Sequence, residues 1–303
     1  IWKNSWKWDQ WMKHLWMEIG ENNLLKFNFI SKKFEVESCS NFHLSVELSD
    51  NFFRYAVLDP NTMKYLILRE YFIEIKNSNQ LSNKIVSIIN SDEFVKRNFY
   101  SNTISISSLN CIVNSSGQTT ENEKLKMLKL ETDVHENIKC DLISHNDSAL
   151  EIIYSIPNST NNLFNNYFNN SSIYCSDTIL IKNYLKELSP LPTLKVHICY
   201  DTIYITYFYN NDIIFHNKFI FKSEEDILYL IINTINQLKI NRDECEMKIS
   251  GRVNELTNSL LEDYLGEFTV EKSKIENTDS SIFKIVLNQI VWESSQEAIE
   301  VKK

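Results

Sequence analysis

The chain has 303 residues, 43% of them hydrophobic, which is enough to shield a sizeable core and excludes an intrinsically disordered protein. It carries 31 basic and 40 acidic residues, a net charge of −9, and therefore offers no broad basic face for nucleic acid. No apolar run in the sequence approaches the roughly 20 residues of a membrane-spanning helix.

The N-terminal segment is rich in tryptophan, and its first 20 residues hold five of the six in the chain. Trp8, Trp11 and Leu15 recur at helical spacing beside lysines, which is typical of an amphipathic helix on a membrane surface. The favoured interpretation is that Met12 or Met17 is the natural start and that the preceding residues are translated upstream sequence or an expression remnant. Residues 1–26 are accordingly assigned to an N-terminal extension that is not native before Met17.

The first half of the chain predicts mostly strands. Three come in succession, separated by turn-forming residues, and they are His43–Leu48, Phe52–Leu58 and Lys64–Phe72. A helix follows whose apolar face is marked by Leu81, Ile85, Ile88 and Ile89. Further on, the patterns predict a strand at Thr103–Val113, a polar loop over 114–123, a strand at Leu150–Ile156 and a short helix near Leu163–Phe168. Asp177 is expected to cap a longer helix that Pro190 ends.

The second half repeats this order. Val196–Phe221 is strand-rich, and Ser223 with Asp226 predicts a capping box at the start of a helix. The last expected elements are a strand at Glu246–Ser250, a helix over Asn254–Leu265 and a strand at Ile282–Val291. The offset between the halves is about 150 residues, and such duplication predicts an α/β protein with two similar lobes that face a cleft. We expect residues 27–190 to form the first lobe and residues 191–303 the second.

The six cysteines are scattered, with no C-x-x-C pair, which favours reduced thiols in a cytoplasmic protein. They are Cys39, Cys111, Cys140, Cys175, Cys199 and Cys245. His197 and Cys199 share one face of a predicted strand, but no second ligand pair lies nearby in sequence, so no metal site is expected.

Two regions of the sequence carry a resemblance to a known family. Phe27–Phe72 and Val196–Gly251 resemble, in segment order and pattern, the two signature regions of domain of unknown function family 3822, a Bacteroidota family. That family is similar in turn to the actin-like ATPase superfamily, which includes pilus-assembly proteins of the PilM type. The resemblance implies a duplicated ribonuclease-H-like core, with a mixed five-stranded sheet flanked by helices in each lobe, and no established activity.

The resemblance also points to two hairpin turns. An actin-like ATPase holds the β- and γ-phosphates with one turn from each lobe, and glycines let the backbone N–H groups approach the anion. Here the corresponding turns read Glu47–Asn51 and Cys199–Thr202, and neither contains a glycine. The adenosine-contacting turn of the superfamily usually has two adjacent glycines, whereas this chain has Gly251 followed by Arg252.

Both turns are acidic as well. Glu47, Asp50 and Asp201 would stand where phosphates approach, and without a bound cation they would repel them. One interpretation is that they coordinate Mg²⁺ or activate water, as in active members of the superfamily. The favoured interpretation is that they are solvated turn residues, because Asp and Asn commonly occupy turns.

The sequence therefore favours a cytoplasmic actin-like protein with degenerate phosphate turns, which acts as a non-catalytic binding or scaffold module. We expect a protein partner, no cofactor, no metal and no nucleic acid, with membrane binding less favoured. The residues of the candidate cleft are Glu47, Asp50, Asp201, Gly251 and Arg252. The first alternative is an ATPase or kinase-like enzyme that binds Mg-ATP. The second is a PilM-like peripheral membrane component, recruited by the N-terminal helix or by a partner peptide.

Overall fold

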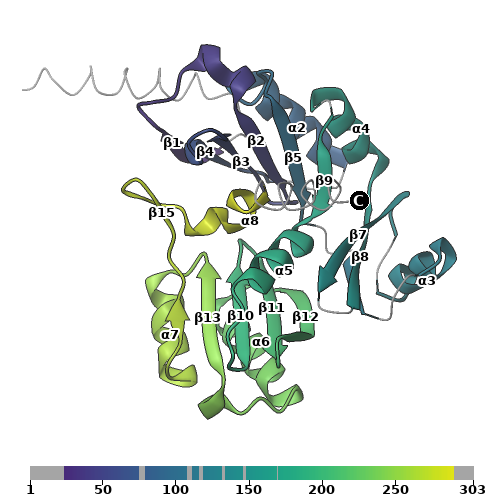
Figure 1. Cartoon of the computed structure of the whole chain (residues 1–303), viewed down its shortest axis with the longest axis vertical. Helices are drawn as coiled ribbons and strands as arrows, with labels where there is room; N and C mark the ends of the chain where they lie inside the picture. Colours follow the sequence, from purple (N-terminus) through teal and green to yellow (C-terminus); the bar gives the residue numbers. More distant parts are fainter. Residues whose placement is uncertain are drawn as a thin grey trace, which may run out of the picture.

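The computed structural model describes residues 24–74, 79–107, 111–115, 119–131, 134–145, 148–168 and 170–289. The predicted tryptophan-rich helix therefore lies outside the described residues. Two α/β lobes lie one above the other in Figure 1, with helix α5 (Ser176–Lys186) and helix α8 (Lys284–Leu287) between them. Within the described ranges, no helix is both long and apolar enough to cross a membrane.

The first lobe is built on a six-stranded sheet in the order β1-β4-β3-β2-β5-β9, so the five strands expected for this lobe are one too few, because β1 adds an edge strand beside β4. Its strands are β1 (Leu24–Ile30), β2 (His43–Leu48), β3 (Phe52–Asp59), β4 (Lys64–Phe72), β5 (Ser101–Ile106) and β9 (Ser172–Cys175). The first four pair antiparallel, whereas β2, β5 and β9 run parallel. Helices α2 (Asn79–Ser91) and α4 (Asn158–Tyr167) pack on one face, where the predicted stripe with Ile85 and Ile88 is fully buried.

The second lobe has the expected five-stranded mixed sheet, in the order β12-β11-β10-β13-β14. Its strands are β10 (Thr193–Ile198), β11 (Thr202–Tyr209), β12 (Asp212–Ile220), β13 (Glu246–Gly251) and β14 (Thr269–Val270). Helix α6 (Glu224–Gln237) begins at the predicted capping box of Ser223 and Asp226. It covers one face of the sheet together with α7 (Glu255–Leu265), and the short helix η2 (Arg242–Glu244) precedes β13.

The two lobes repeat one another in strand register. Glu47 on β2 lies opposite Ser105 on the parallel strand β5. His197 on β10 lies opposite Ser250 on the parallel strand β13. Each of these central strands also forms an antiparallel hairpin with the strand that follows it. The predicted duplication is thus confirmed, while the boundary expected at residues 190 and 191 stays a prediction.

A three-stranded sheet, β6-β8-β7, is inserted in the sequence between β5 and β9. It consists of β6 (Cys111–Asn114), β7 (Asn137–His145) and β8 (Ser148–Ile156), with helix α3 (Glu121–Glu131) beside it. The single strand predicted at Thr103–Val113 is therefore wrong, because its two ends belong to different sheets. The predicted loop is too long, because Thr120 and Glu123 bind each other's backbone N–H groups and start α3 within it.

The chain's last described elements pack back onto the first lobe. A short hairpin of β15 (Lys274–Ile275) and β16 (Thr278–Asp279) leads into η3 (Ser281–Phe283) and α8. The strand predicted at Ile282–Val291 is wrong over its described part, which is helical. Phe283 and Val286, three positions apart, both enter a cluster with Phe29 and Leu68, which is the spacing of one helix face.

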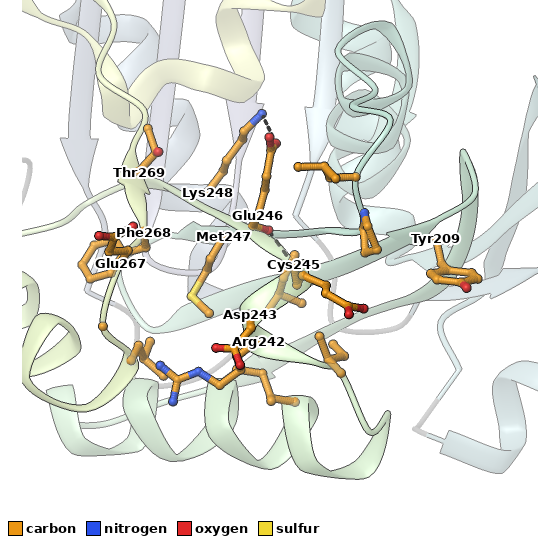
Figure 2. A pocket seen from close by; sticks show the side chains of 18 of the residues that line it. Tyr209, Arg242, Asp243, Cys245, Glu246, Met247, Lys248, Glu267, Phe268 and Thr269 are labelled. Atoms are coloured by element: carbon orange, nitrogen blue, oxygen red, sulfur yellow. Dashed lines mark hydrogen bonds and ion pairs between the residues drawn. The ribbon is translucent and has the colours of Figure 1, made fainter.

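A pocket of about 1570 Å³ opens on the second lobe beside the start of β13 (Figure 2). Arg242, Met247 and Phe268 are among the residues around it. A smaller pocket, about 530 Å³, lies between α5, β13 and α8, and Glu187, Lys248 and Lys284 contribute to its lining.

Candidate functional site

The two hairpin turns of the resemblance meet each other between the lobes. In the first, the Ser49 N–H donates to the Phe52 carbonyl, and in the second the Cys199 N–H donates to the Thr202 carbonyl. The side-chain amide of Asn51 then donates to the carboxylate of Asp201 across the cleft, although the two residues are 150 positions apart. The structure therefore brings together the two segments that the sequence placed in the cleft.

Negative charge gathers at this meeting point. Asp50 is exposed as a residue, yet its pKa lies above the usual value, first because its carboxyl is partly desolvated and second because Asp201 lies near. Asp201 is half-buried and also accepts a hydrogen bond from the hydroxyl of Thr202 at 3.1 Å. An anionic ligand at the turns would meet two carboxyl groups, and the one on Asp201 already disfavours the charged form of Asp50.

Glu47 does not fit the expectation of a solvated turn residue, because its side chain is fully buried. Its Oε2 lies 3.5 Å from Nη1 of Arg54, and its Oε1 has no hydrogen-bond partner among the described residues. Burial, with a smaller contribution from Glu70, raises the pKa of Glu47 to about 7 in spite of Arg54. Glu47 is thus a buried carboxyl group that titrates near neutrality.

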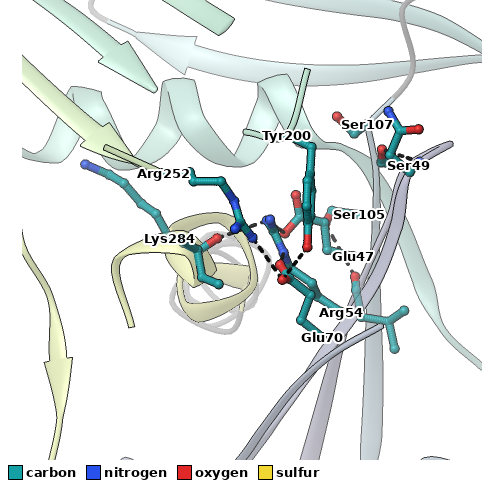
Figure 3. Close-up of polar contacts among 12 residues, drawn as sticks. Glu47, Ser49, Arg54, Glu70, Ser105, Ser107, Tyr200, Arg252 and Lys284 are labelled. Atoms are coloured by element: carbon teal, nitrogen blue, oxygen red, sulfur yellow. Dashed lines mark hydrogen bonds and ion pairs between the residues drawn. The ribbon is translucent and has the colours of Figure 1, made fainter. Parts of the chain in front are cut away.

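Glu70 on β4 is the centre of a polar network that joins the lobes (Figure 3). Its Oε2 accepts from Nε of Arg54 at 2.5 Å, within the first lobe. Its Oε1 accepts from the hydroxyl of Tyr200 at 2.6 Å and from Nη2 of Arg252 at 3.0 Å, both in the second lobe. Burial alone would raise the pKa of Glu70, but Arg54, Tyr200 and Arg252 together hold it below the usual value.

Ring stacking fills the space around this network. The guanidinium of Arg252 lies 4.1 Å from the ring centroid of Tyr200, and that of Arg54 lies 3.8 Å from the ring of Phe52. The rings of Phe52 and Tyr200 are themselves 5.6 Å apart. Arg54 is therefore enclosed by carboxylates and an aromatic face, whereas Arg252 is held by Glu70 and Tyr200 but keeps a side chain that is 40% exposed.

Gly251 has a structural role at its position. Its φ is +93°, and a Cβ there would lie 2.1 Å from the carbonyl oxygen of Ile198 on the neighbouring strand. The next residue, Arg252, donates its backbone N–H to that same carbonyl at 2.8 Å. The glycine is explained by close backbone packing between β13 and β10, without a ligand.

The five predicted residues thus have different surroundings. Glu47, Asp50, Asp201, Gly251 and Arg252 all lie on the strand ends and turns of the cleft, but none of them lines either of the two pockets described above. None belongs to a metal-ligand cluster either. The one group of three such side chains found in the described ranges is Cys111, Cys175 and Asp177.

The sequence reasoning missed Arg54 and Glu70, which organise the site. Both are buried charges within strands that also contain several large apolar residues, and they lie directly opposite each other in the β3–β4 pairing. Opposite charges that pair across two strands of one hairpin are the signal that could have found them. Tyr200 could be found only from tertiary structure, because its partner is 130 positions away.

Solved structures with the same fold include a protein of actin-like ATPase fold and unknown function from Bacteroides thetaiotaomicron. It is 18% identical, with a TM-score of 0.69, and the match covers 78% of this chain and 93% of that chain. The cytoplasmic domain of EpsL, an inner membrane component of the type II secretion system of Vibrio cholerae, is 13% identical with a TM-score of 0.50, covering 84% and 95%. The PilM–PilN type IV pilus biogenesis complex is 10% identical with a TM-score of 0.52, and the match covers 82% of this chain and 98% of that chain. Together these matches establish the actin-like ATPase fold.

A search of curated proteins finds no match to this chain. One protein-family model matches residues 31–266, which includes both hairpin turns and all five predicted cleft residues. The chain belongs to the family described as Protein of unknown function (DUF3822).

Proposed function

We propose that this protein is a pseudo-ATPase, a member of the actin-like fold that binds a protein partner as a scaffold and performs no nucleotide chemistry. The observation that carries the proposal is the environment of Glu70. Its carboxylate is 1% exposed and binds Arg54 of its own lobe together with Tyr200 and Arg252 of the other. We infer that these charged side chains leave no room between the two turns for phosphates and their cation.

The chemistry of phosphate binding supports the same conclusion. Backbone N–H groups and cations stabilise phosphate in this kind of cleft. Here the turns carry Ser49, Asp50 and Asn51 where glycines would allow close approach, and the two nearest arginines are held by Glu47 and Glu70. Asp50 and Asp201 add repulsion.

The alternative is an enzyme that binds Mg²⁺ through Glu47, Asp50 and Asp201. Its best support is the Oε1 atom of Glu47, which has no hydrogen-bond partner within the described part of the chain. The surroundings of Glu47 argue against a metal-binding role. The Oε2 atom of this buried carboxyl is directed at Arg54, whose positive charge would repel a metal ion.

The choice of a protein partner rests on the fold. EpsL is described as an inner membrane component of a secretion system and PilM as part of a complex with PilN, so two proteins of this fold belong to assemblies. We extend this to the present chain as a cytoplasmic scaffold without a cofactor.

The test is a thermal-shift titration with Mg·ATP, Mg·ADP and Mg·GTP up to millimolar concentration. A ligand present at 100 times its Kd stabilises a fold by about 2.7 kcal/mol, which raises Tm by several degrees for a chain of this size. We expect a flat response to every nucleotide. A rise in Tm with wild type that disappears in Asp201→Ala, but persists in the matched surface variant Asp243→Ala, would overturn the proposal and support the Mg²⁺-dependent enzyme.

A further inference from the structure

A second cluster of reactive side chains lies where the inserted sheet, the first lobe and the second lobe meet. Cys111 is the first residue of β6 in the inserted sheet, and Cys175 is the last residue of β9 in the first lobe. Asp177 lies in the first turn of α5, while His216 and Lys218 lie on β12 of the second lobe. The expectation that Asp177 caps α5 is therefore wrong, because Cys175 is the N-cap residue and the carboxylate is directed at the second lobe.

The contacts within the cluster are close. The sulfur atoms of Cys111 and Cys175 are 3.5 Å apart, and the Cys175 thiol donates to Oδ2 of Asp177 at 3.0 Å. The same oxygen lies 2.8 Å from Nζ of Lys218, and Oδ1 lies 3.0 Å from Nε2 of His216. Cys175 is fully buried, whereas Cys111 is partly exposed. Cys111 is therefore the partly exposed residue of the pair, and the sulfur of the buried Cys175 lies 3.5 Å from its own.

A metal site is the first interpretation to weigh, because ligand atoms of Cys111, Cys175 and Asp177 all lie within 4.8 Å of one another. Lys218 opposes it. Its buried ammonium already neutralises Asp177, and both carboxylate oxygens have partners. A divalent ion would have to displace this ammonium from a buried ion pair and remain next to its charge. The geometry fits sulfur chemistry between the two cysteines better than metal ligation.

We propose that Cys111 and Cys175 form a reversible dithiol, which a hydroperoxide oxidises to a disulfide that ties the inserted sheet to the start of α5. The sulfur–sulfur distance must fall from 3.5 Å to about 2.05 Å, a change that side-chain rotation on two residues can share.

The reaction proceeds in two balanced steps. The Cys111 thiol releases its proton and the thiolate attacks the terminal oxygen of the hydroperoxide, so that an S–O bond forms and the O–O bond breaks. The leaving alkoxide takes up the released proton and becomes an alcohol, or water where the oxidant is hydrogen peroxide. The sulfur of Cys175 then attacks the sulfur of Cys111, the S–O bond breaks, and hydroxide leaves as water with the Cys175 proton. Two thiols lose two electrons and two protons, and the hydroperoxide is reduced to an alcohol and water.

The surroundings suit this division of roles. Burial, the contact with Cys111 and the charge of Asp177 hold the pKa of the Cys175 thiol well above its usual value, so Cys175 stays protonated until the second step. When its S–H donor is lost, Asp177 keeps Lys218 and His216 as partners. No carboxylate oxygen is then left buried without a partner, and the cluster tolerates both redox states.

The test uses the reduced, full-length protein treated with a small excess of hydrogen peroxide. We expect a mass loss of two hydrogen atoms, one linked peptide that contains Cys111 and Cys175, and full reversal by dithiothreitol. The new bond closes a loop across 64 positions, so Tm is expected to rise by roughly 5–10 °C on oxidation.

Two variants make the test specific. Cys111→Ser should abolish the linked peptide and the rise in Tm, whereas Cys245→Ser, which alters another partly buried cysteine, should leave both unchanged. Linkage of any other pair, or oxidation of Cys111 to a sulfinic acid without linkage, would overturn the proposal. So would a bound metal ion in the wild-type protein that Cys111→Ser lacks, because it would identify the cluster as a metal site.

Discussion

Arg252 of the second lobe lies 3.0 Å from Glu70 of the first, and the same carboxylate oxygen accepts the hydroxyl of Tyr200. Arg54 holds the other oxygen from within the first lobe. The two arginines differ in burial, because the side chain of Arg252 is 40% exposed and that of Arg54 only 1%. The lobes are therefore joined through a carboxylate whose partners should contribute unequally to stability.

The first prediction concerns this inequality. Glu70→Ala leaves the buried guanidinium of Arg54 without its closest partner, and the expected loss in the free energy of unfolding is about 3–5 kcal/mol. Arg252→Ala removes a partly solvated ion pair and should cost about 1 kcal/mol or less. Urea unfolding of both variants and the wild type measures the difference. Equal losses for the two variants would contradict the assignment of Arg54 as the main partner.

The second prediction is a pH dependence at Glu47. Its pKa is raised from 4.5 to about 7, so between these values the folded protein holds a proton that the unfolded chain releases. Stability from this group is therefore fully present below pH 4.5 and is lost as pH rises to about 7. Each unit of pKa shift corresponds to about 1.4 kcal/mol, which predicts a decline of about 1–3 kcal/mol across this range.

Glu47→Gln keeps the shape of the side chain and removes the titration. Urea unfolding between pH 4 and pH 8 should show a smaller decline for this variant than for the wild type. Glu267→Gln, at an exposed site outside the cleft, is the matched control and should retain the wild-type slope. A decline in Glu47→Gln as steep as in wild type would show that another group is responsible.

The third prediction has the opposite sign and concerns Asp177. Burial alone would raise its pKa, but the charge of Lys218 and the hydrogen bond with His216 hold it well below 3.8. Stability from this group is present above pH 3.8 and is lost as pH falls below that value. Asp177→Asn leaves Lys218 buried without a counter-charge, so we expect a loss of about 3–5 kcal/mol at pH 7 that narrows in acid. Urea unfolding from pH 2 to pH 7 measures the difference in the free energy of unfolding between the wild type and Asp177→Asn. A difference that does not change with pH would contradict the lowered pKa of Asp177.

The sequence predicted the positions of the two turns better than the side-chain interactions between the lobes. Turn residues around Asp50 and Asp201 could be located because hairpin signals are local, and the duplication implied that they face each other. The network around Glu70 depends on pairs that are 130 and 182 positions apart, which no local pattern contains. The sequence did not predict the burial of Glu47 either, since its position near the end of a strand is compatible with exposure to solvent, whereas in the structure its side chain is fully buried next to Arg54.

The secondary-structure prediction was wrong where one apolar run contributes side chains to two different hydrophobic clusters. The described part of the strand predicted at Ile282–Val291 is helical because Val286 faces the first-lobe cluster with Phe29, while Ile285 faces another cluster with Tyr184. In a short run, alternation and helical spacing place apolar residues at overlapping positions, so the sequence alone could not separate them.

The last prediction separates packing from ligand binding at Gly251. In Gly251→Ala the new methyl group would lie 2.1 Å from the Ile198 carbonyl oxygen in a backbone with φ of +93°, so both the clash and the strain oppose folding. We expect a loss of at least about 3 kcal/mol, which circular dichroism would report as a large fall in Tm. Gly266→Ala is the matched control, because its φ is also positive, at +72°, while its nearest contact is the flexible end of Arg242 at 3.6 Å. That variant should lose about 1–2 kcal/mol from backbone strain alone. Equal losses would mean that close packing against Ile198 adds nothing, and the glycine would then have to be explained by the approach of a ligand.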